Sequence, residues 1–252
     1  MRDPDWLVPE WQASGVGALM TTRAGGISLA PFESLNLRDA VGDDPLAVAH
    51  NQRVVEEAIG ATPVYLNQVH GCGVVRLTGA DLRAEAAVHD ADGSITTEPD
   101  IACAIQVADC LPMLFAAPGA RAVGAAHAGW RGLAAGVVEA TLHALCEAAS
   151  CAPSEVRTWL GPCIGPTQFE VGPDVLEAFR ATPDSPRFRP RGPGKWLADL
   201  PNLARDRLLA AGVTQISGGR WCTVSEPSRF FSFRRDRITG RMGAFIWIEP
   251  AG

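Results

Sequence analysis

Two apolar runs joined by a short turn decide the fold class of this chain: Leu111-Pro-Met-Leu-Phe-Ala-Ala117 and Ala122-Val-Gly-Ala-Ala-His127, with Pro118-Gly-Ala-Arg121 between them. Both runs have the length and composition of buried strands, and the Pro-Gly pair favours a tight connection. We therefore predict a β-hairpin. If its loop is centred between Pro118 and Gly119, Cys110 lies directly opposite His127, with Cβ atoms about 4.5 to 5.5 Å apart.

Further strands and helices surround this hairpin. Short apolar runs predict strands over Pro63 to Val69, Val74 to Leu77, Ile101 to Val107, Val156 to Leu160 and Ala244 to Ile248. Apolar residues spaced by three or four predict helices over Pro45 to Ile59, Leu133 to Ala149, Pro173 to Arg180 and Leu200 to Ala211. The segment from Thr182 to Gly194, dense in Pro and Gly, is predicted to be a surface loop. The mixture indicates an α/β (mixed α+β) fold with a mixed sheet and leaves the strand order open.

Length and composition indicate one globular domain over residues 1–252. Of the 252 residues, 47% are hydrophobic and 20% are charged, and no internal repeat is visible. A net charge of -6 gives no electrostatic footprint for nucleic acid. No apolar run approaches the roughly 18 residues of a membrane helix and the N-terminus lacks the pattern of a signal peptide, so we expect a cytoplasmic protein. The seven cysteines, without a CxxC pair, are expected to be free thiols.

Three side chains form a candidate metal site. Cys110 and His127 meet across the predicted hairpin, and His70 in Asn67-Gln-Val-His-Gly71 ends another predicted strand just before a glycine. Two imidazoles and a thiolate are ligands that zinc prefers, and three protein ligands leave one coordination position for water or substrate. The site is therefore predicted to be catalytic rather than structural.

The alternative for Cys110 alone is a small core residue, which is the usual role of a free cysteine after an apolar strand. Asp109 before it and Pro112 after it are unusual neighbours for a core strand and favour the ligand role. The other three histidines, His50, His89 and His143, are expected at the surface. Cys163 stays ambiguous between packing and function, and the remaining cysteines are expected to pack.

Arginines and glycines supply a weaker signal for an anion. Gly129-Trp-Arg-Gly132 opens a predicted helix, where backbone N–H groups and Arg131 favour phosphate or carboxylate, although simple capping explains the same pattern. Arg23 lies in a second flexible turn, Thr21-Thr-Arg-Ala-Gly-Gly26. Aromatic and arginine side chains near a metal would suit a flat, oxygen-rich ligand such as a nucleoside.

The order of these motifs along the chain carries a resemblance. The motifs are Thr21-Thr-Arg-x-Gly-Gly, Ser34-Leu-Asn-Leu37, Asn67-Gln-Val-His-Gly71, Ala108-Asp-Cys-Leu-Pro112, His127-Ala-Gly-Trp-Arg-Gly132, Gly161-Pro-x-Ile-Gly165, Phe169-Glu-Val-Gly172, and Phe230-Phe-Ser-Phe-Arg-Arg-Asp236 with Thr239-Gly-Arg241. The chain resembles, over nearly its whole length, the bacterial laccase-domain family, also described as polyphenol oxidase, purine nucleoside phosphorylase or peptidoglycan editing factor.

The resemblance implies an α/β/β/α layered fold and a zinc ion bound by His70, Cys110 and His127. It also implies phosphorolysis of adenosine, inosine, guanosine or methylthioadenosine to the free base and pentose 1-phosphate, with adenosine deamination as a further activity. The chain departs from the family pattern at Asn51-Gln-Arg53, Phe233 and Cys163, which affects fine substrate preference and leaves the three ligands untouched.

Several functions compete for these residues. A multicopper oxidase needs His-x-His motifs, and none of the five histidines has that spacing, although copper in the same three-ligand site could still give slow phenol oxidation. A thiol amidase acting on cell-wall precursors would use Cys110 as nucleophile and His127 as base. A zinc-stabilised module without activity is disfavoured because three ligands leave the ion open.

We favour a zinc-dependent purine nucleoside phosphorylase. In this hypothesis, Arg23 and Arg131 bind phosphate or a ribose hydroxyl, while Asn36 and Gln68 orient the ligands and the substrate. The expected partners are a small-molecule nucleoside and phosphate, with no nucleic acid, membrane or obligate protein partner.

Overall fold

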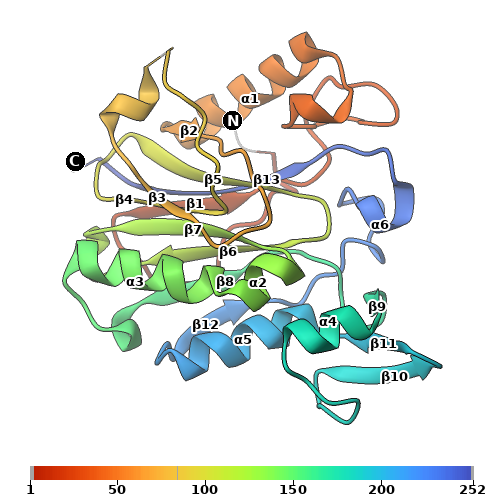
Figure 1. The fold of residues 1–252 in the computed structure, drawn as a ribbon. Helices are drawn as coiled ribbons and strands as arrows, with labels where there is room; N and C mark the ends of the chain where they lie inside the picture. The colour runs from red at the N-terminus through yellow and green to blue at the C-terminus, as the bar shows by residue number, and fades with distance from the viewer. Residues whose placement is uncertain (1–2, 84, 251–252) are drawn as a thin grey trace.

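The protein is described by a computed structural model over residues 3–83 and 85–250, in which two sheets pack face to face (Figure 1). The first sheet has the strand order β1 (Val16–Met20), β13 (Met242–Ile248), β5 (Ile101–Val107) and β2 (Thr62–Val64). The second has the order β12 (Gln215–Gly218), β8 (Arg157–Leu160), β6 (Leu111–Ala116), β7 (Val123–Ala128), β4 (Gly93–Thr96) and β3 (Val74–Leu77). Both sheets are mixed, because β2 runs parallel to β5, and β3 and β12 run parallel to their neighbours.

Helices cover the outer faces of both sheets. Helix α1 (Pro45–Ile59) lies on the four-stranded sheet, while α2 (Trp130–Ala135), α3 (Val137–Ala149) and α5 (Leu200–Ala210) lie on the six-stranded one (Figure 1). The shorter helices are α4 (Pro173–Ala178) and α6 (Phe233–Asp236), with 3-10 turns η1 (Asp39–Val41), η2 (Gly79–Leu82), η3 (Pro118–Ala120) and η4 (Pro153–Glu155). The α/β/β/α layering and the mixed α/β class predicted from the sequence are confirmed.

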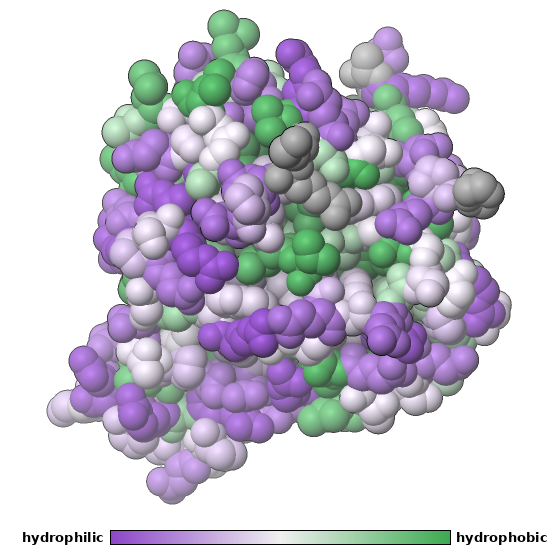
Figure 2. Space-filling model, turned by 180° about the vertical axis from the view of Figure 1, so that it is seen from behind, coloured by the Kyte–Doolittle hydropathy of each residue, from purple (hydrophilic) through white to green (hydrophobic). Residues whose placement is uncertain are grey.

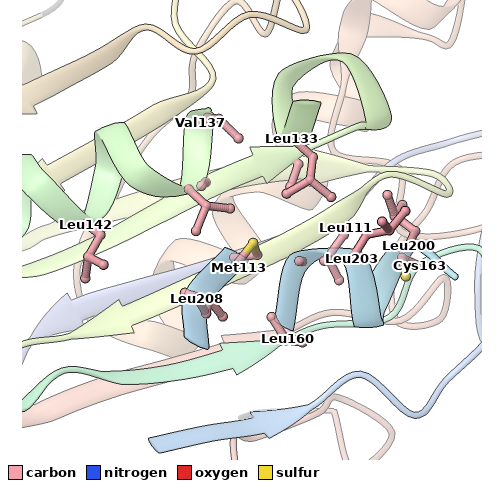
Figure 3. Close-up of a cluster of buried hydrophobic side chains, with 14 of the residues drawn as sticks. Leu111, Met113, Leu133, Val137, Leu142, Leu160, Cys163, Leu200, Leu203 and Leu208 are labelled. Atoms are coloured by element: carbon pink, nitrogen blue, oxygen red, sulfur yellow. The ribbon is translucent and has the colours of Figure 1, made fainter. Parts of the chain in front are cut away.

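Alternation along the strands divides the core into three apolar layers. Ile101, Cys103 and Ile105 of β5 face the second sheet, whereas Ala102 and Ala104 face α1. Successive side chains of a strand point to opposite faces, so a strand buried on both sides must be apolar throughout. The layer under α3 and α5 joins Leu111 and Met113 of β6 to Leu133, Leu142 and Leu203 (Figure 3).

The predicted hairpin exists, but the predicted register is wrong by two residues. Pro112 and not Cys110 lies opposite His127, and Leu111 lies opposite Ala128. The cause is the loop, which closes through an Ala117 N–H to Ala122 carbonyl bond of 3.0 Å and is centred one residue later than predicted. A shift of two residues keeps every side chain on its face. Cys110 therefore stays on the same side of the hairpin as His127.

Three other predictions need correction. The strand predicted over Pro63 to Val69 is the shorter β2, which ends at Val64. The single helix over Leu133 to Ala149 is two helices, because Gly136 takes a φ of 101° and its N–H caps the carbonyls of Gly132 and Leu133. The loop predicted from Thr182 to Gly194 contains β10 (Phe188–Gly192), which pairs with β11 (Lys195–Ala198) and through it with β9 (Glu170–Val171). Pro190 is tolerated because β10 is an edge strand.

The surface is mixed in character. Figure 2 shows the face turned away from the view of Figure 1, where hydrophilic side chains border scattered hydrophobic ones. Isolated exposed apolar residues such as Leu29 and Leu46 are normal for a folded chain. Among the helices formed by the described residues, none is long and apolar enough to cross a membrane.

Candidate metal centre

The three predicted ligands meet at one edge of the two sheets. His70 follows β2, Cys110 ends the turn that carries the chain from β5 to β6, and His127 lies near the end of β7. Their ligand atoms all lie within 4.8 Å of one another. The Cys110 Sγ lies 3.9 Å from His70 Nε2, and the two imidazole rings meet edge to face with centroids 4.8 Å apart. The sequence prediction that these side chains form one cluster is confirmed.

Asp92 fixes two of these ligands and was given no role from the sequence. Its buried carboxylate accepts a 2.7 Å hydrogen bond from His127 Nδ1. It also accepts backbone N–H groups from Val69 at 3.1 Å, His70 at 2.9 Å and Gly71 at 2.7 Å. His70 has a φ of 61°, a left-handed conformation that a non-glycine residue keeps only when its surroundings hold it. The carboxylate therefore holds both the loop of His70 and the ring of His127.

The charges of the cluster favour a thiolate. Burial raises the pKa of Cys110, but the charge and hydrogen bond of His127, followed by those of His70, bring it down to about 6. Burial lowers the pKa of His127, whereas Cys110 and Asp92 raise it to about 9. Burial likewise raises the pKa of Asp92, but its bonds to His127 and to the Gly71 N–H hold it below the ordinary value. Without a metal, Cys110 and His127 thus form an ion pair near neutral pH.

This donor set fits a zinc ion. Tetrahedral zinc with bonds of about 2.0 to 2.3 Å holds its ligands about 3.3 to 3.8 Å apart, so the observed distances need only small side-chain adjustments. The Asp92 carboxylate at Nδ1 leaves Nε2 of His127 as the metal-binding nitrogen, which is the usual carboxylate–histidine–zinc arrangement.

Gly129 lets the turn that follows β7 approach the cluster closely. A Cβ there would lie 3.0 Å from His70 Cδ2 and 3.1 Å from Cys110 Sγ. A side chain at this position would therefore displace His70 or Cys110 by a few tenths of an ångström.

Two cavities open on the cluster and share part of their lining. The first has a volume of about 380 Å³ and includes Arg38, Gln68, Gln106 and Arg241 in its wall. The second has a volume of about 280 Å³ and includes Trp130, Arg131, Phe169 and Arg234. His70, Ala108, Cys110 and Phe233 line both. A substrate can thus reach across the cluster from one cavity to the other.

The other predicted site residues are spread over different places. Gln68 lines the first cavity and is held by Gln106, through a 2.8 Å bond from its side-chain amide to the Gln106 carbonyl and another from the Gln106 N–H. Arg131 lines the second cavity, with its guanidinium 4.2 Å from the centre of the Trp130 ring. Asn36 is buried behind the first cavity, where it holds backbone groups.

Arg23 is not among the residues that line either cavity. Its guanidinium donates to the carbonyls of Glu33 and Pro227, each at 3.0 Å, and lies over the Phe231 ring. Arg23 therefore ties its turn to the segment before α6. Two other arginines, Arg38 and Arg241, line the first cavity, and neither is among the site residues predicted from the sequence.

The histidines outside the cluster lie at or near the surface, as predicted, whereas Cys72 is exposed and not packed as predicted. His50 and His143 are exposed, and His89 pairs with Asp81 at 2.7 Å. Cys163 is fully buried and lies beside Cys222 through an isolated β-bridge. The seven cysteines are free.

Together, the fold and the site define a single-chain mixed α/β protein with a His–Cys–His cluster that opens on two cavities. The family model described as multi-copper polyphenol oxidoreductase laccase matches residues 17–249. The chain belongs to this family.

Named relatives match over nearly the whole chain. A purine nucleoside phosphorylase of Pseudomonas aeruginosa is 48% identical over 97% of this chain and 98% of its own length. One of Escherichia coli is 46% identical over 96% and 98%. Among solved structures, YlmD from Geobacillus stearothermophilus superposes with a TM-score of 0.91 at 37% identity, covering 99% of this chain and 98% of its own. A Neisseria meningitidis protein of the family DUF152 gives 0.90 at 44% identity, covering 98% and 100%.

Proposed function

We propose that this chain is a zinc-dependent purine nucleoside phosphorylase acting on adenosine, inosine, guanosine or methylthioadenosine. The observation that carries the proposal is the cluster of His70, Cys110 and His127, which has the donors of an open zinc site and lines the first cavity, with His70 and Cys110 also lining the second. Relatives at 41–48% identity over their full length bear the name purine nucleoside phosphorylase. The first cavity alone is within the size range of small-molecule sites.

The reaction needs two reactants held together. An oxygen of hydrogen phosphate bonds to C1′ of the pentose, the bond from C1′ to the purine nitrogen breaks, and its electron pair leaves with the base. The proton of hydrogen phosphate ends on the base. A zinc ion, when bound, supplies a Lewis acid at an open coordination position. The protein's own contribution is position: the two cavities meet at the cluster and hold both reactants near it.

The orientation and tautomer of the His127 ring, which Asp92 fixes, support a role of His127 in metal binding. Asp92 keeps a proton on Nδ1, so Nε2 faces the cluster, and His70 is held by the same carboxylate through its N–H. A ligand cluster held this way keeps its geometry while substrates enter and leave. Adenosine deamination at the same site is part of the proposal as a secondary activity, as are a cytoplasmic location and action without nucleic acid or an obligate protein partner.

One observation favours a second candidate, a thiol amidase. Cys110 with a lowered pKa, His127 with a raised one and Asp92 behind it have the order of a nucleophile, a base and an orienting carboxylate. The same three groups would activate a thiolate in the absence of metal. Copper in the site would give a third activity, slow phenol oxidation, because copper follows the same ligand preferences and has a redox change that zinc lacks.

Chelation and alkylation separate the first two candidates. If Cys110 is a zinc ligand, a chelator abolishes inosine cleavage, added zinc restores it, and iodoacetamide is slow on the loaded protein. If Cys110 is the nucleophile, chelation leaves activity intact and alkylation removes it in step with modification of Cys110. The surface cysteine Cys72, replaced by Ser, is the control for alkylation outside the site.

A further inference from the structure

Arg38 and Arg241 both line the first cavity, and the side chain of Asn36 forms hydrogen bonds to the backbone of each. The buried Asn36 accepts the Arg38 N–H at 3.1 Å and the Arg241 N–H at 2.8 Å through its Oδ1. Its Nδ2 donates to the Arg38 carbonyl and to Asp43, both at 2.9 Å. Asn36 therefore sets the two arginine backbones in fixed positions relative to each other. Two segments that are about 200 residues apart in sequence meet here.

The pair carries positive charge that no ion pair offsets, although the charges of Cys110 and Asp109 act on Arg241. Within residues 3–83 and 85–250, neither guanidinium forms an ion pair, and no Asp or Glu lines the first cavity. The Arg241 guanidinium donates through one nitrogen to the carbonyls of Thr239 and Gly240 at 2.8 and 3.0 Å. Among the residues that the structure describes, the Arg38 side chain has no hydrogen-bond partner. Burial and then the charge of Arg38 lower the pKa of Arg241. Two such cations side by side are stabilised by a bound anion.

The second cavity has a different character. Two of its arginines lie over aromatic rings of the same wall: Arg131 over Trp130, and Arg234 over Phe169, where Arg234 also donates to the Glu170 carbonyl at 3.0 Å. The carboxylate of Asp109 also lies in this wall. Flat aromatic faces with scattered polar groups suit a purine ring better than a phosphate.

We propose that Arg38 and Arg241 form the phosphate-binding site and that the second cavity receives the purine base. This inference rests on the proposed phosphorylase function. The pentose then lies over His70 and Cys110, which both cavities share, with phosphate and base on opposite sides of it. In a displacement at C1′ the phosphate oxygen must approach from the side opposite the bond that breaks, so phosphate and base are assigned to different cavities. Phosphate is thus assigned to Arg38 and Arg241 rather than to Arg23 and Arg131.

The test compares phosphate binding and kinetics in four proteins. These are the wild type, Arg38→Ala, Arg131→Ala, and Arg189→Ala as an exposed arginine outside the site. Inorganic phosphate is titrated against chloride at equal ionic strength, and the rise in Tm is measured for zinc-loaded and for metal-free protein. KM values for phosphate and for inosine are measured on the zinc-loaded forms. Arg38→Lys checks whether charge without the planar fork is enough.

We expect phosphate to raise the Tm of every protein except Arg38→Ala, with or without zinc. In Arg38→Ala the KM for phosphate rises about tenfold to 100-fold, the loss of a hydrogen bond to a charged group, while the KM for inosine changes less than about threefold. Arg38→Lys lies between Arg38→Ala and the wild type. Arg131→Ala changes the KM for inosine and not that for phosphate.

The inference is overturned if Arg38→Ala keeps the wild-type Tm shift and phosphate KM, or if Arg131→Ala alone loses them. It is also overturned if both KM values rise equally in Arg38→Ala. A failure of the proposed function looks different: phosphate still raises the Tm through Arg38, but no protein cleaves inosine. In that case the anion site stands and the phosphorylase assignment falls.

Discussion

Replacing Asp92 by Asn should weaken zinc binding without changing the size of any side chain at the site. Each carboxylate oxygen accepts two donors: Oδ1 takes His127 Nδ1 and the His70 N–H, and Oδ2 takes the N–H groups of Val69 and Gly71. An amide has one oxygen, so whichever way it turns, its NH₂ faces two donors. Two hydrogen bonds to a charged group are lost, each worth about 1.5 to 3 kcal/mol.

We expect zinc affinity to fall about 10-fold to 100-fold, as is typical when the carboxylate behind a histidine ligand is removed. The assay is competition with a chromophoric chelator at pH 7.5, with Tm measured on the metal-free protein. Asp81→Asn is the matched control, because Asp81 pairs with His89 at the same 2.7 Å distance but outside the cluster. The reasoning is refuted if Asp92→Asn binds zinc within about twofold of wild type, or if Asp81→Asn weakens it equally.

Three further results follow from the geometry. Gly129→Ala should lower zinc affinity and leave a folded protein, because the new Cβ approaches His70 and Cys110 at 3.0 and 3.1 Å; unchanged metal content by elemental analysis contradicts this. In metal-free protein, the rate of Cys110 alkylation should stay constant as the pH is lowered to about 6 and should decrease at lower pH, since the thiolate is protonated as the pH drops through a pKa of about 6. A midpoint near the ordinary thiol value of about 8.5 contradicts the ion pair with His127. Oxidation of phenols should follow added copper and be absent from copper-free, zinc-loaded protein, because zinc has no redox change.

The elements that the sequence predicted best are those whose apolar pattern is unambiguous. Strands β3 and β5 and helix α1 have the predicted limits, since the strands are mostly apolar runs, each with one polar residue, and the apolar residues of the helix recur with helical spacing. Helix α1 is also marked by Asp44, whose side chain accepts the Leu46 N–H, and by Gly60 after its last residue. Local signals of this kind are sufficient where tertiary contacts agree with them.

Strand β1 was missed although it is apolar throughout, but three other missed strands lack such signals. Strand β4, Gly-Ser-Ile-Thr, is buried only because it lies between β3 and β7, and β12 begins with exposed residues at a sheet edge. Strand β10 contains Pro190 and follows a segment rich in proline. In each case the pairing partner, which is distant in sequence, decides the structure.

For the site, residue chemistry was enough to find the three side chains of the cluster and not enough to find the residues that hold them in place. The three side chains of the cluster could be singled out because histidine and cysteine are rare in this chain and lie here at the ends of predicted strands. Asp92 is one of many acidic residues, and its role depends on where β4 begins relative to β7. Arg38 and Arg241 likewise become a pair only through Asn36, a contact that no local pattern contains.

The central claim is tested most directly by the products formed from inosine on zinc-loaded, metal-analysed protein with and without inorganic phosphate. Chromatography of the products should show hypoxanthine and pentose 1-phosphate in equal amounts when phosphate is present, and neither when it is omitted. Release of hypoxanthine with free pentose in the absence of phosphate, or no cleavage of any purine nucleoside by fully zinc-loaded protein, would contradict the phosphorylase assignment.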